Sequence, residues 1–137
     1  MLRELLKNKI FSRIIINALE NKEVLDIILF GSIARGKDEP SDIDIMIVYI
    51  NKDDNNYSYE LRKKMEKNGF KVHISSNSYK GLFNPSFLAR EGIIFEGYSF
   101  KLNSFLSSAF GFSSFMLFRY YLEGMNNSEK MSFYYTL

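Results

Sequence analysis

The chain has 137 residues, a length that predicts a single domain. Hydrophobic residues make up 46% of it, enough for a buried core, and a net charge of +2 is too small by itself to indicate nucleic-acid binding. There is no cysteine, which excludes a disulfide framework and a cysteine metal site. The start is charged rather than signal-like, and the uncharged stretch Leu102–Phe118 is serine-rich and short for a membrane span. We therefore expect a cytoplasmic protein with no membrane-spanning segment.

The first half of the chain predicts two helices and two strands. Apolar residues at helical spacing predict a helix over Leu2–Leu19. Apolar, β-branched runs predict strands over Val24–Phe30 and Asp42–Ile50. The polar stretch Asn51–Tyr57 predicts a loop, and Tyr59–Lys67 an exposed helix.

The second half predicts a third strand over Phe70–Ser75 and then a loop over Ser76–Asn84. Pro85 favours a helix start, with the helix over Ser86–Glu91 and a short extended piece after it over Gly92–Phe95. Two further helices are predicted, over Asn103–Glu123 and Ser128–Tyr135.

This order of elements predicts an α/β (α+β) fold, in which helices pack on a small mixed β-sheet. We expect residues 1–100 to form the main domain. Residues 101–137 are expected to form a C-terminal helical extension that serves packing or oligomerisation, the two parts making one compact unit.

Residues 31–44 read GSIARGKDEPSDID, and their last part carries two acids at the start of a predicted strand. Side chains two apart on a strand share a face, so Asp42 and Asp44 point the same way. Two adjacent carboxylates repel each other unless a cation lies between them, and Mg²⁺ is commonly bound by one or two carboxylates together with substrate phosphates. The sequence therefore predicts that Asp42 and Asp44 bind a metal together and are not simply a solvated strand end.

The first part of the same segment suits a phosphate. Gly31 has no Cβ and lets backbone approach a ligand, and Ser32 is expected to cap a short helix over Ile33–Arg35 whose free N–H groups attract an anion. The alternative for Ser32 is a plain helix cap. Arg35 adds a positive charge that either contacts phosphate or pairs with an acid of the loop, Asp38 or Glu39. Ser41 is expected to brace the acids as a turn residue. A phosphate-binding turn next to metal-binding acids is the combination that phosphoryl or nucleotidyl transfer uses.

The series GS, ARG and SDID between two strands resembles the signature of the minimal nucleotidyltransferases of the DNA polymerase β-like superfamily. The resemblance covers residues of about 10–97 and implies the fold of that superfamily. It implies that Gly31 and Ser32 hold the triphosphate of a nucleoside triphosphate (NTP) and that Asp42 and Asp44 bind Mg²⁺, with Mn²⁺ as a substitute. It also implies transfer of a nucleoside monophosphate to a hydroxyl acceptor. Family members often act as antitoxins beside a small helical partner of the HEPN type, which implies such a partner here.

Two features depart from the family pattern: the spacing between Ser32 and Asp42 is one residue shorter than usual, and, more seriously, the family's third aspartate is missing. The strand expected to hold it, Phe70–Ser75, has no acid, and depending on register Lys71 or His73 takes its place. A lysine at this place would repel a metal. The other roles considered for Lys71 are a surface residue and a phosphate contact. Neutral histidine can ligate a metal or act as a base, although a plain structural role is the commoner one. We therefore expect slow or absent transfer, and the alternative is a catalytically degenerate module that binds a nucleotide or a partner. A third candidate function is nucleic-acid binding without catalysis, and it is the weakest because the net charge is only +2.

The last third of the chain is rich in aromatic residues. They are Phe105, Phe110, Phe112, Phe115, Phe118, Tyr120, Tyr121, Phe133, Tyr134 and Tyr135. Core packing explains some of them, but one helix face in a small domain cannot bury them all. We expect the remainder to form a homo-oligomer interface. Base stacking is the weaker alternative, because basic residues are sparse there.

Overall fold

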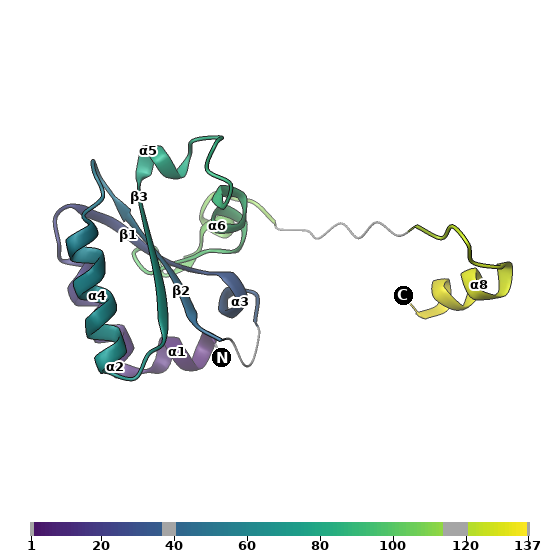
Figure 1. Cartoon of the computed structure of the whole chain (residues 1–137), viewed down its shortest axis with the longest axis horizontal. Helices are drawn as coiled ribbons and strands as arrows, with labels where there is room; N and C mark the ends of the chain where they lie inside the picture. Colours follow the sequence, from purple (N-terminus) through teal and green to yellow (C-terminus); the bar gives the residue numbers. More distant parts are fainter. Residues whose placement is uncertain (1, 37–40, 114–120, 137) are drawn as a thin grey trace.

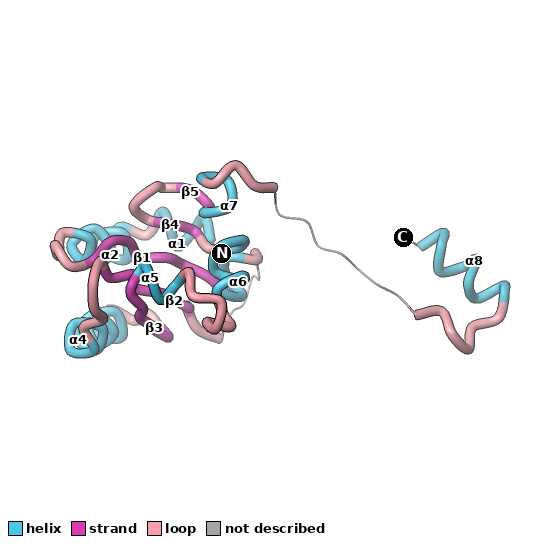
Figure 2. Tube along the Cα trace, turned by 90° about the horizontal axis from the view of Figure 1, so that it is seen from above, coloured by secondary structure: helices cyan, strands magenta, loops and turns pink. Residues whose placement is uncertain are grey.

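A computed structural model describes residues 2–36, 41–113 and 121–136. In this part of the chain a mixed sheet of five strands, in the order β3-β2-β1-β4-β5, carries helices on both faces (Figures 1 and 2). The expected α/β fold with a small mixed sheet is confirmed. The strands are β1 (Val24–Phe30), β2 (Ile43–Tyr49), β3 (Val72–Ser78), β4 (Tyr98–Ser99) and β5 (Ser104–Phe105). The helices are α1 (Leu2–Lys7), α2 (Lys9–Leu19), α3 (Gly31–Ala34), α4 (Asn55–Lys67), α5 (Tyr79–Leu82), α6 (Arg90–Glu96), α7 (Leu106–Ala109) and α8 (Asn127–Thr136).

The strand pairing gathers three chain segments at one end of the sheet. β1 runs antiparallel to β2, with Phe30 opposite Asp44, so the end of β1 lies beside the start of β2. β3 runs parallel to β2, with His73 opposite Asp44, so the start of β3 lies there too. The Gly-Ser turn after β1, the acids at the start of β2 and the start of β3 are therefore neighbours.

The two faces of the sheet pack against different helices. Ile45 and Ile47 belong to the core that α1, α2 and α4 form on one face, whereas Met46 and Val48 pack with residues of α5, α6 and α7 on the other. Strand alternation places Asp44 on the second face. The prediction that Ile43, Ile45 and Ile47 face a core opposite the acids is confirmed.

Two helix boundaries in the first half differ from the prediction because asparagine and aspartate side chains cap the helices there. The helix expected over Leu2–Leu19 is broken at Asn8, whose side chain accepts hydrogen bonds from the N–H groups of Ile10 and Phe11 and starts α2. Asp54 likewise accepts from the N–H of Tyr57, so α4 begins inside the stretch expected to be a loop.

Tertiary packing overrides local preference in the second half. Ser76, Asn77 and Ser78 were expected in a loop, but they continue β3 because their backbone pairs with Ile47–Tyr49. Gly92–Phe95 was expected to be extended, and the helix was expected over Ser86–Glu91. In the structure the helix is instead α6, over Arg90–Glu96, so Gly92–Phe95 is helical. This helix buries Ile93 completely against the second face of the sheet.

The helix expected over Asn103–Glu123 is wrong in its described part. Ser104 and Phe105 pair with β4 as β5, and α7 ends at Ala109. Phe115, Phe118 and Tyr120, which were expected at an interface, lie outside the described residues. The last helix is confirmed as α8, none of whose described side chains is buried. Several described aromatics are indeed exposed, namely Phe110, Phe112, Tyr121, Tyr134 and Tyr135.

None of the helices in the described ranges is both long and apolar enough to cross a bilayer.

A buried carboxylate joins β1 to the turn between β4 and β5. Asp26 accepts hydrogen bonds from the N–H groups of Ile27 (2.7 Å) and Lys101 (3.1 Å) and from the hydroxyl of Ser99 (2.5 Å). Burial raises the pKa of the Asp26 carboxyl above its usual value, although these three hydrogen bonds oppose the shift. Asp26 therefore holds the outer strands to the sheet at an electrostatic cost.

Replacing Asp26 with alanine should lower the free energy of unfolding by about 1–3 kcal/mol, because it leaves buried donors without an acceptor. Asp26→Asn is the matched control, since its side-chain oxygen can still accept from both N–H groups. Because the pKa is raised in the folded state, the natural carboxyl's contribution is fully present below its unfolded pKa and is lost as pH rises through the folded value. Urea unfolding at several pH values should show this dependence in the natural chain and not in Asp26→Asn. A loss in Asp26→Asn equal to that in Asp26→Ala would contradict the assigned role.

Candidate active site

Asp42 and Asp44 stand at the start of β2, and both are half-buried. The hydroxyl of Ser41 donates to Oδ1 of Asp42 over 2.7 Å, which fixes that carboxylate and agrees with the bracing expected of Ser41. Asp44 lies in the strand itself, with its side chain 24% exposed. The two acids thus occupy rigid positions at an accessible end of the sheet.

Gly31 begins α3 directly beside Asp44. Its φ of +73° belongs to the left-handed region, and a Cβ there would overlap the carboxylate of Asp44. The sequence predicted a glycine that admits a ligand; in this structure the space it leaves is used by Asp44. The Gly-Ser turn and the acids therefore form one contiguous structure.

Replacing Gly31 with alanine should displace Asp44 and weaken Mg²⁺-dependent triphosphate binding at least tenfold. The positive φ should also cost about 1–2 kcal/mol of stability. Gly36→Ala is the matched control, because Gly36 has a similar φ of +85° and open space where its Cβ would lie. Both variants should lose stability in thermal unfolding, but only Gly31→Ala should lose affinity in calorimetric titration. Equal affinity losses would show that backbone strain alone is responsible.

Ser32 lies in the first turn of α3 and does not cap it. The helix begins one residue earlier than expected, and Phe30 is its N-cap without a side-chain hydrogen bond. The Ser32 side chain makes no hydrogen bond within the described residues, so its hydroxyl is available to a ligand. The expectation that Ser32 caps the helix is wrong, because Gly31 can adopt the conformation that starts it.

Arg35 ends α3 and reaches an acid from a distant part of the sequence. Its guanidinium donates to Oε2 of Glu96 over 2.9 Å, and both side chains are partly exposed. An exposed pair of this kind stabilises by under about 1 kcal/mol, so it can open for a phosphate. Asp38 and Glu39, the partners considered from the sequence, lie outside the described residues. Glu96 could not have been found from the sequence, because it lies 61 residues from Arg35.

The strand β3 brings His73, and not Lys71, beside the acids. His73 is the parallel-strand neighbour of Asp44, and its Nδ1 lies 3.3 Å from Oδ1 of Asp44. Its side chain is 64% exposed, so it faces the open site. Lys71 precedes β3, where its carbonyl accepts from the N–H of Ile43, and its side chain is exposed. The register that the sequence left open thus places His73 nearest the acids.

The acids and the glycine turn fit a divalent cation that shares its coordination with phosphate. Two carboxylates on one strand end provide oxygen ligands, which Mg²⁺ prefers. Among the residues that the structure describes, no three His, Asp or Glu side chains cluster closely enough to hold a metal by themselves. A metal bound by these two acids would complete its coordination with other oxygen atoms, such as those of substrate phosphates or water.

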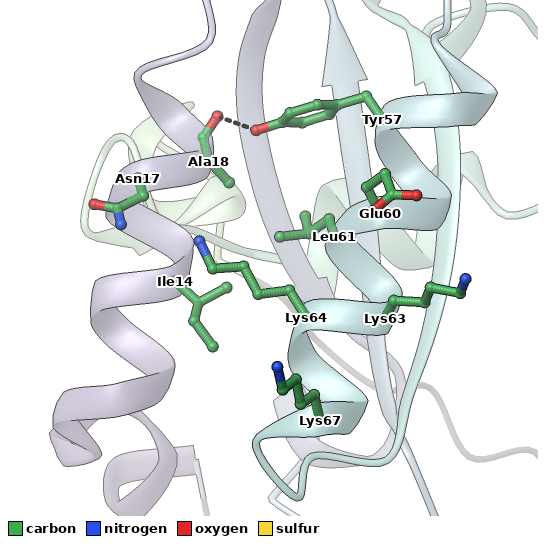
Figure 3. Close-up of a pocket in the computed structure, with 9 residues that line it drawn as sticks. All are labelled: Ile14, Asn17, Ala18, Tyr57, Glu60, Leu61, Lys63, Lys64 and Lys67. Carbon is green, nitrogen blue, oxygen red and sulfur yellow. Dashed lines mark hydrogen bonds between the residues drawn. The ribbon is translucent and has the colours of Figure 1, made fainter.

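A pocket of about 440 Å³ between α2 and α4 lies on the other face of the sheet (Figure 3). Its floor is apolar, with Ile14 and Leu61, and the Tyr57 hydroxyl donates to the carbonyl of Ala18 across it. It contains none of the side chains expected from the sequence to act on a nucleotide. It is therefore not part of the candidate site.

The chain is similar to proteins of known structure and to one family model. One solved structure, a toxin–antitoxin complex crystallised with AMP-PNP, is 25% identical and covers 64% of this chain and 70% of its own, with a TM-score of 0.50. A mutant MntA–HpeT toxin–antitoxin complex is 23% identical and covers 73% of this chain and 83% of its own, with a TM-score of 0.50, a likeness of fold alone. No curated protein sequence matches significantly. The family model described as "Polymerase beta, Nucleotidyltransferase" matches residues 13–96, more than half of the chain, and the protein therefore belongs to this nucleotidyltransferase family.

Proposed function

We propose that this protein binds an NTP with Mg²⁺ at the strand ends described above and transfers its nucleoside monophosphate to a hydroxyl. The observation that carries the proposal is the contiguity of Gly31 with Asp44, which joins a turn suited to phosphate to a pair of acids suited to metal. Membership of the nucleotidyltransferase family supports the reaction class.

Each group has a role in this proposal. Gly31 and the hydroxyl of Ser32, which makes no hydrogen bond to another described residue, bind the triphosphate, and Arg35 leaves Glu96 to add a positive charge. Asp42 and Asp44 would hold Mg²⁺, with Mn²⁺ as a substitute, and a cation bound there would supply neutralisation of phosphate charge. The acceptor oxygen forms a bond to the α-phosphorus, the bond from that phosphorus to the bridging oxygen breaks, and pyrophosphate leaves.

His73 replaces the carboxylate that would otherwise receive the acceptor's proton. Its imidazole is beside Asp44 and open to solvent, so it can take that proton when neutral. It prefers softer metals than Mg²⁺ and adds no negative charge to the site. We therefore expect slow transfer with triphosphate binding preserved, and a lesser role for Lys71 as a phosphate contact.

The acceptor we propose is a hydroxyl on a partner protein, with this chain acting as an antitoxin on a helical HEPN-type toxin. The likeness to a toxin–antitoxin complex crystallised with AMP-PNP supports this setting. We further propose that residues 101–137 extend the main domain of residues 1–100 and that exposed aromatic side chains near their end, such as Tyr134 and Tyr135, mediate self-association. A cytoplasmic location suits an intracellular partner of this kind.

The second candidate is a binding module that keeps the nucleotide site without catalysis. The specific observation in its favour is histidine in place of the third acid beside Asp44. In this case the protein would bind an NTP, or mask its partner, and release no pyrophosphate.

The test is calorimetric titration of the whole chain with ATP in Mg²⁺, together with transfer of labelled nucleoside monophosphate to a co-expressed partner. Metal-dependent binding with slow labelling would support the enzyme, and binding without labelling in either Mg²⁺ or Mn²⁺ would support the module. No metal-dependent binding would overturn the enzyme and the nucleotide-binding module, and would leave only a module that masks its partner.

A further inference from the structure

An apolar groove of about 290 Å³ lies on the second face of the sheet, toward the start of β1 and the end of β2. The proposed nucleotide site is at the other end of the same two strands. Ile28, Val48 and Leu82 line the groove and are buried. Of its described lining residues only Asp26 and Lys101 are charged, and the Asp26 carboxyl already accepts hydrogen bonds from the protein. The groove therefore offers apolar contact, and little hydrogen bonding, to whatever covers it.

Four large side chains at the rim of this groove are open to solvent. Tyr79 and Phe83 come from α5 and the residue after it, Leu102 from the turn between β4 and β5, and Phe110 from the end of α7. All four are between 40% and 53% exposed. The rings of Phe83 and Phe110 pack edge to face, with centroids 6.4 Å apart. Exposed apolar side chains that gather around one hollow mark an interaction surface.

The helix α8 has the complementary property, because it buries none of its described side chains. Met131, Tyr134 and Tyr135 are between 51% and 83% exposed, and their spacing of three and four residues places them on one side of the helix. This side is the apolar face of α8. A helix of 10 residues is marginal by itself in water, since most helical stability comes from packing such a face. The helix α8 therefore needs an apolar surface to cover it.

A second copy of this chain can satisfy both surfaces at once. No described residue of α8 lines the groove, and α8 lies apart from the sheet and its helices (Figure 1). A single chain thus leaves the groove and the apolar face of α8 uncovered. In a two-fold symmetric pair each copy supplies one of each, so that both are covered twice. Residues 111–126 connect the rim to α8, and an extended segment of that length reaches at most ~50 Å, enough to cross to a neighbouring copy.

We propose that this protein forms a symmetric dimer in which α8 of each copy lies in the groove of the other, with its apolar face against the rim. Placing one apolar helix face in a hydrophobic groove is a common mode of recognition, with anchors spaced by three and four residues. The inference rests on the self-association put forward with the proposed function and names the surface that receives the helix. It leaves the nucleotide site, at the other end of the sheet, open in both copies.

Analytical ultracentrifugation of the whole chain tests the association. The natural chain should sediment as a dimer that dissociates on dilution. Met131→Asp on α8 and Leu102→Asp on the rim should each raise the dissociation constant at least tenfold, because a charge would enter an apolar contact. Ile16→Asp is the matched control, since Ile16 is 59% exposed on α2, which packs on the first face of the sheet. It should dimerise as the natural chain does, and circular dichroism should show that all three variants fold.

Cysteine cross-linking identifies the two surfaces directly, because the natural chain has no cysteine. Leu102→Cys and Tyr134→Cys are placed in separate chains, one of which carries a size tag, and the mixture is oxidised with Cu(II)–phenanthroline. A disulfide between the two chains should form at least tenfold faster than in a mixture of Ile16→Cys with Tyr134→Cys.

Three outcomes would contradict the exchange of α8. A natural chain that stays monomeric at high concentration would overturn this inference together with the proposed self-association, and would leave the proposed nucleotide transfer intact. A dimer that neither aspartate variant weakens would overturn the groove alone. A chain carrying both cysteines that closes only an internal disulfide would show that α8 covers its own groove and not that of a second copy.

Discussion

Replacing Asp42 or Asp44 with asparagine should abolish Mg²⁺-dependent triphosphate binding, with a loss in affinity of at least ~100-fold. Changes to residues that only support metal ligands already cost ~10–100-fold, and each of these acids is proposed as a ligand itself. Asparagine keeps the size of the side chain but removes the negative charge that opposes the cation. The measurement is calorimetric titration with ATP at fixed Mg²⁺, and with ATP alone as the metal-free reference.

The fold should survive both changes, because the two side chains stand at a strand end and not in the core. We expect the free energy of unfolding to change by less than about 1 kcal/mol, since only partly exposed polar contacts are altered. Ser41→Ala is the matched control: it removes the 2.7 Å hydrogen bond to Asp42 but no charge, and should weaken binding only a few fold. Affinity unaffected in both asparagine variants would remove the metal site from the proposal.

Replacing His73 with aspartate should raise the rate of nucleoside monophosphate transfer by about 10²–10⁴-fold, the usual contribution of a general base. The new carboxylate would stand opposite Asp44 on the parallel strand, where His73 Nδ1 now lies 3.3 Å from Asp44 Oδ1. It would add negative charge toward the metal and accept the acceptor's proton. Labelled transfer to the co-expressed partner, in Mg²⁺ and in Mn²⁺, measures the gain.

Lys71→Asp is the control for position, because it introduces the same charge just before β3 and not opposite Asp44. It should give little or no gain. A gain from Lys71→Asp alone would mean that the productive register differs from the one described. Fast turnover by the natural chain would show that His73 already fills the role, and no gain from either variant would favour the binding module.

The proximity of the proposed phosphate-binding and metal-binding residues could be predicted from the sequence because it is local. Gly31, Asp42 and Asp44 lie within one connection between two paired strands, so their spacing already implies their neighbourhood. The register of β3 could not be predicted, since a slip by one or two residues leaves its sequence pattern equally plausible. Glu96 reaches Arg35 only through the packing of α6 against α3, for which the sequence holds no local signal.

The difference between local signals and long-range packing also explains which predicted helices and strands were wrong. The strand over Val24–Phe30 was predicted correctly because its apolar run is unambiguous. The helix over Asn103–Glu123 was wrong because β4 offers unpaired backbone groups that Ser104 and Phe105 satisfy as β5. The polar end of β3 was missed for a similar reason, since its hydrogen bonds to β2 compensate for the low strand preference of serine and asparagine.

The open position of His73 has an evolutionary consequence. Its side chain is largely exposed and supports no core contact, so the fold places little selective constraint on that residue. Histidine and aspartate codons differ by a single base, which makes the exchange accessible in one mutational event. Under the proposed function, a lineage carrying this scaffold could therefore pass between a strongly and a weakly modifying form without an unstable intermediate, and selection could set the rate at one codon while the rest of the domain stays unchanged.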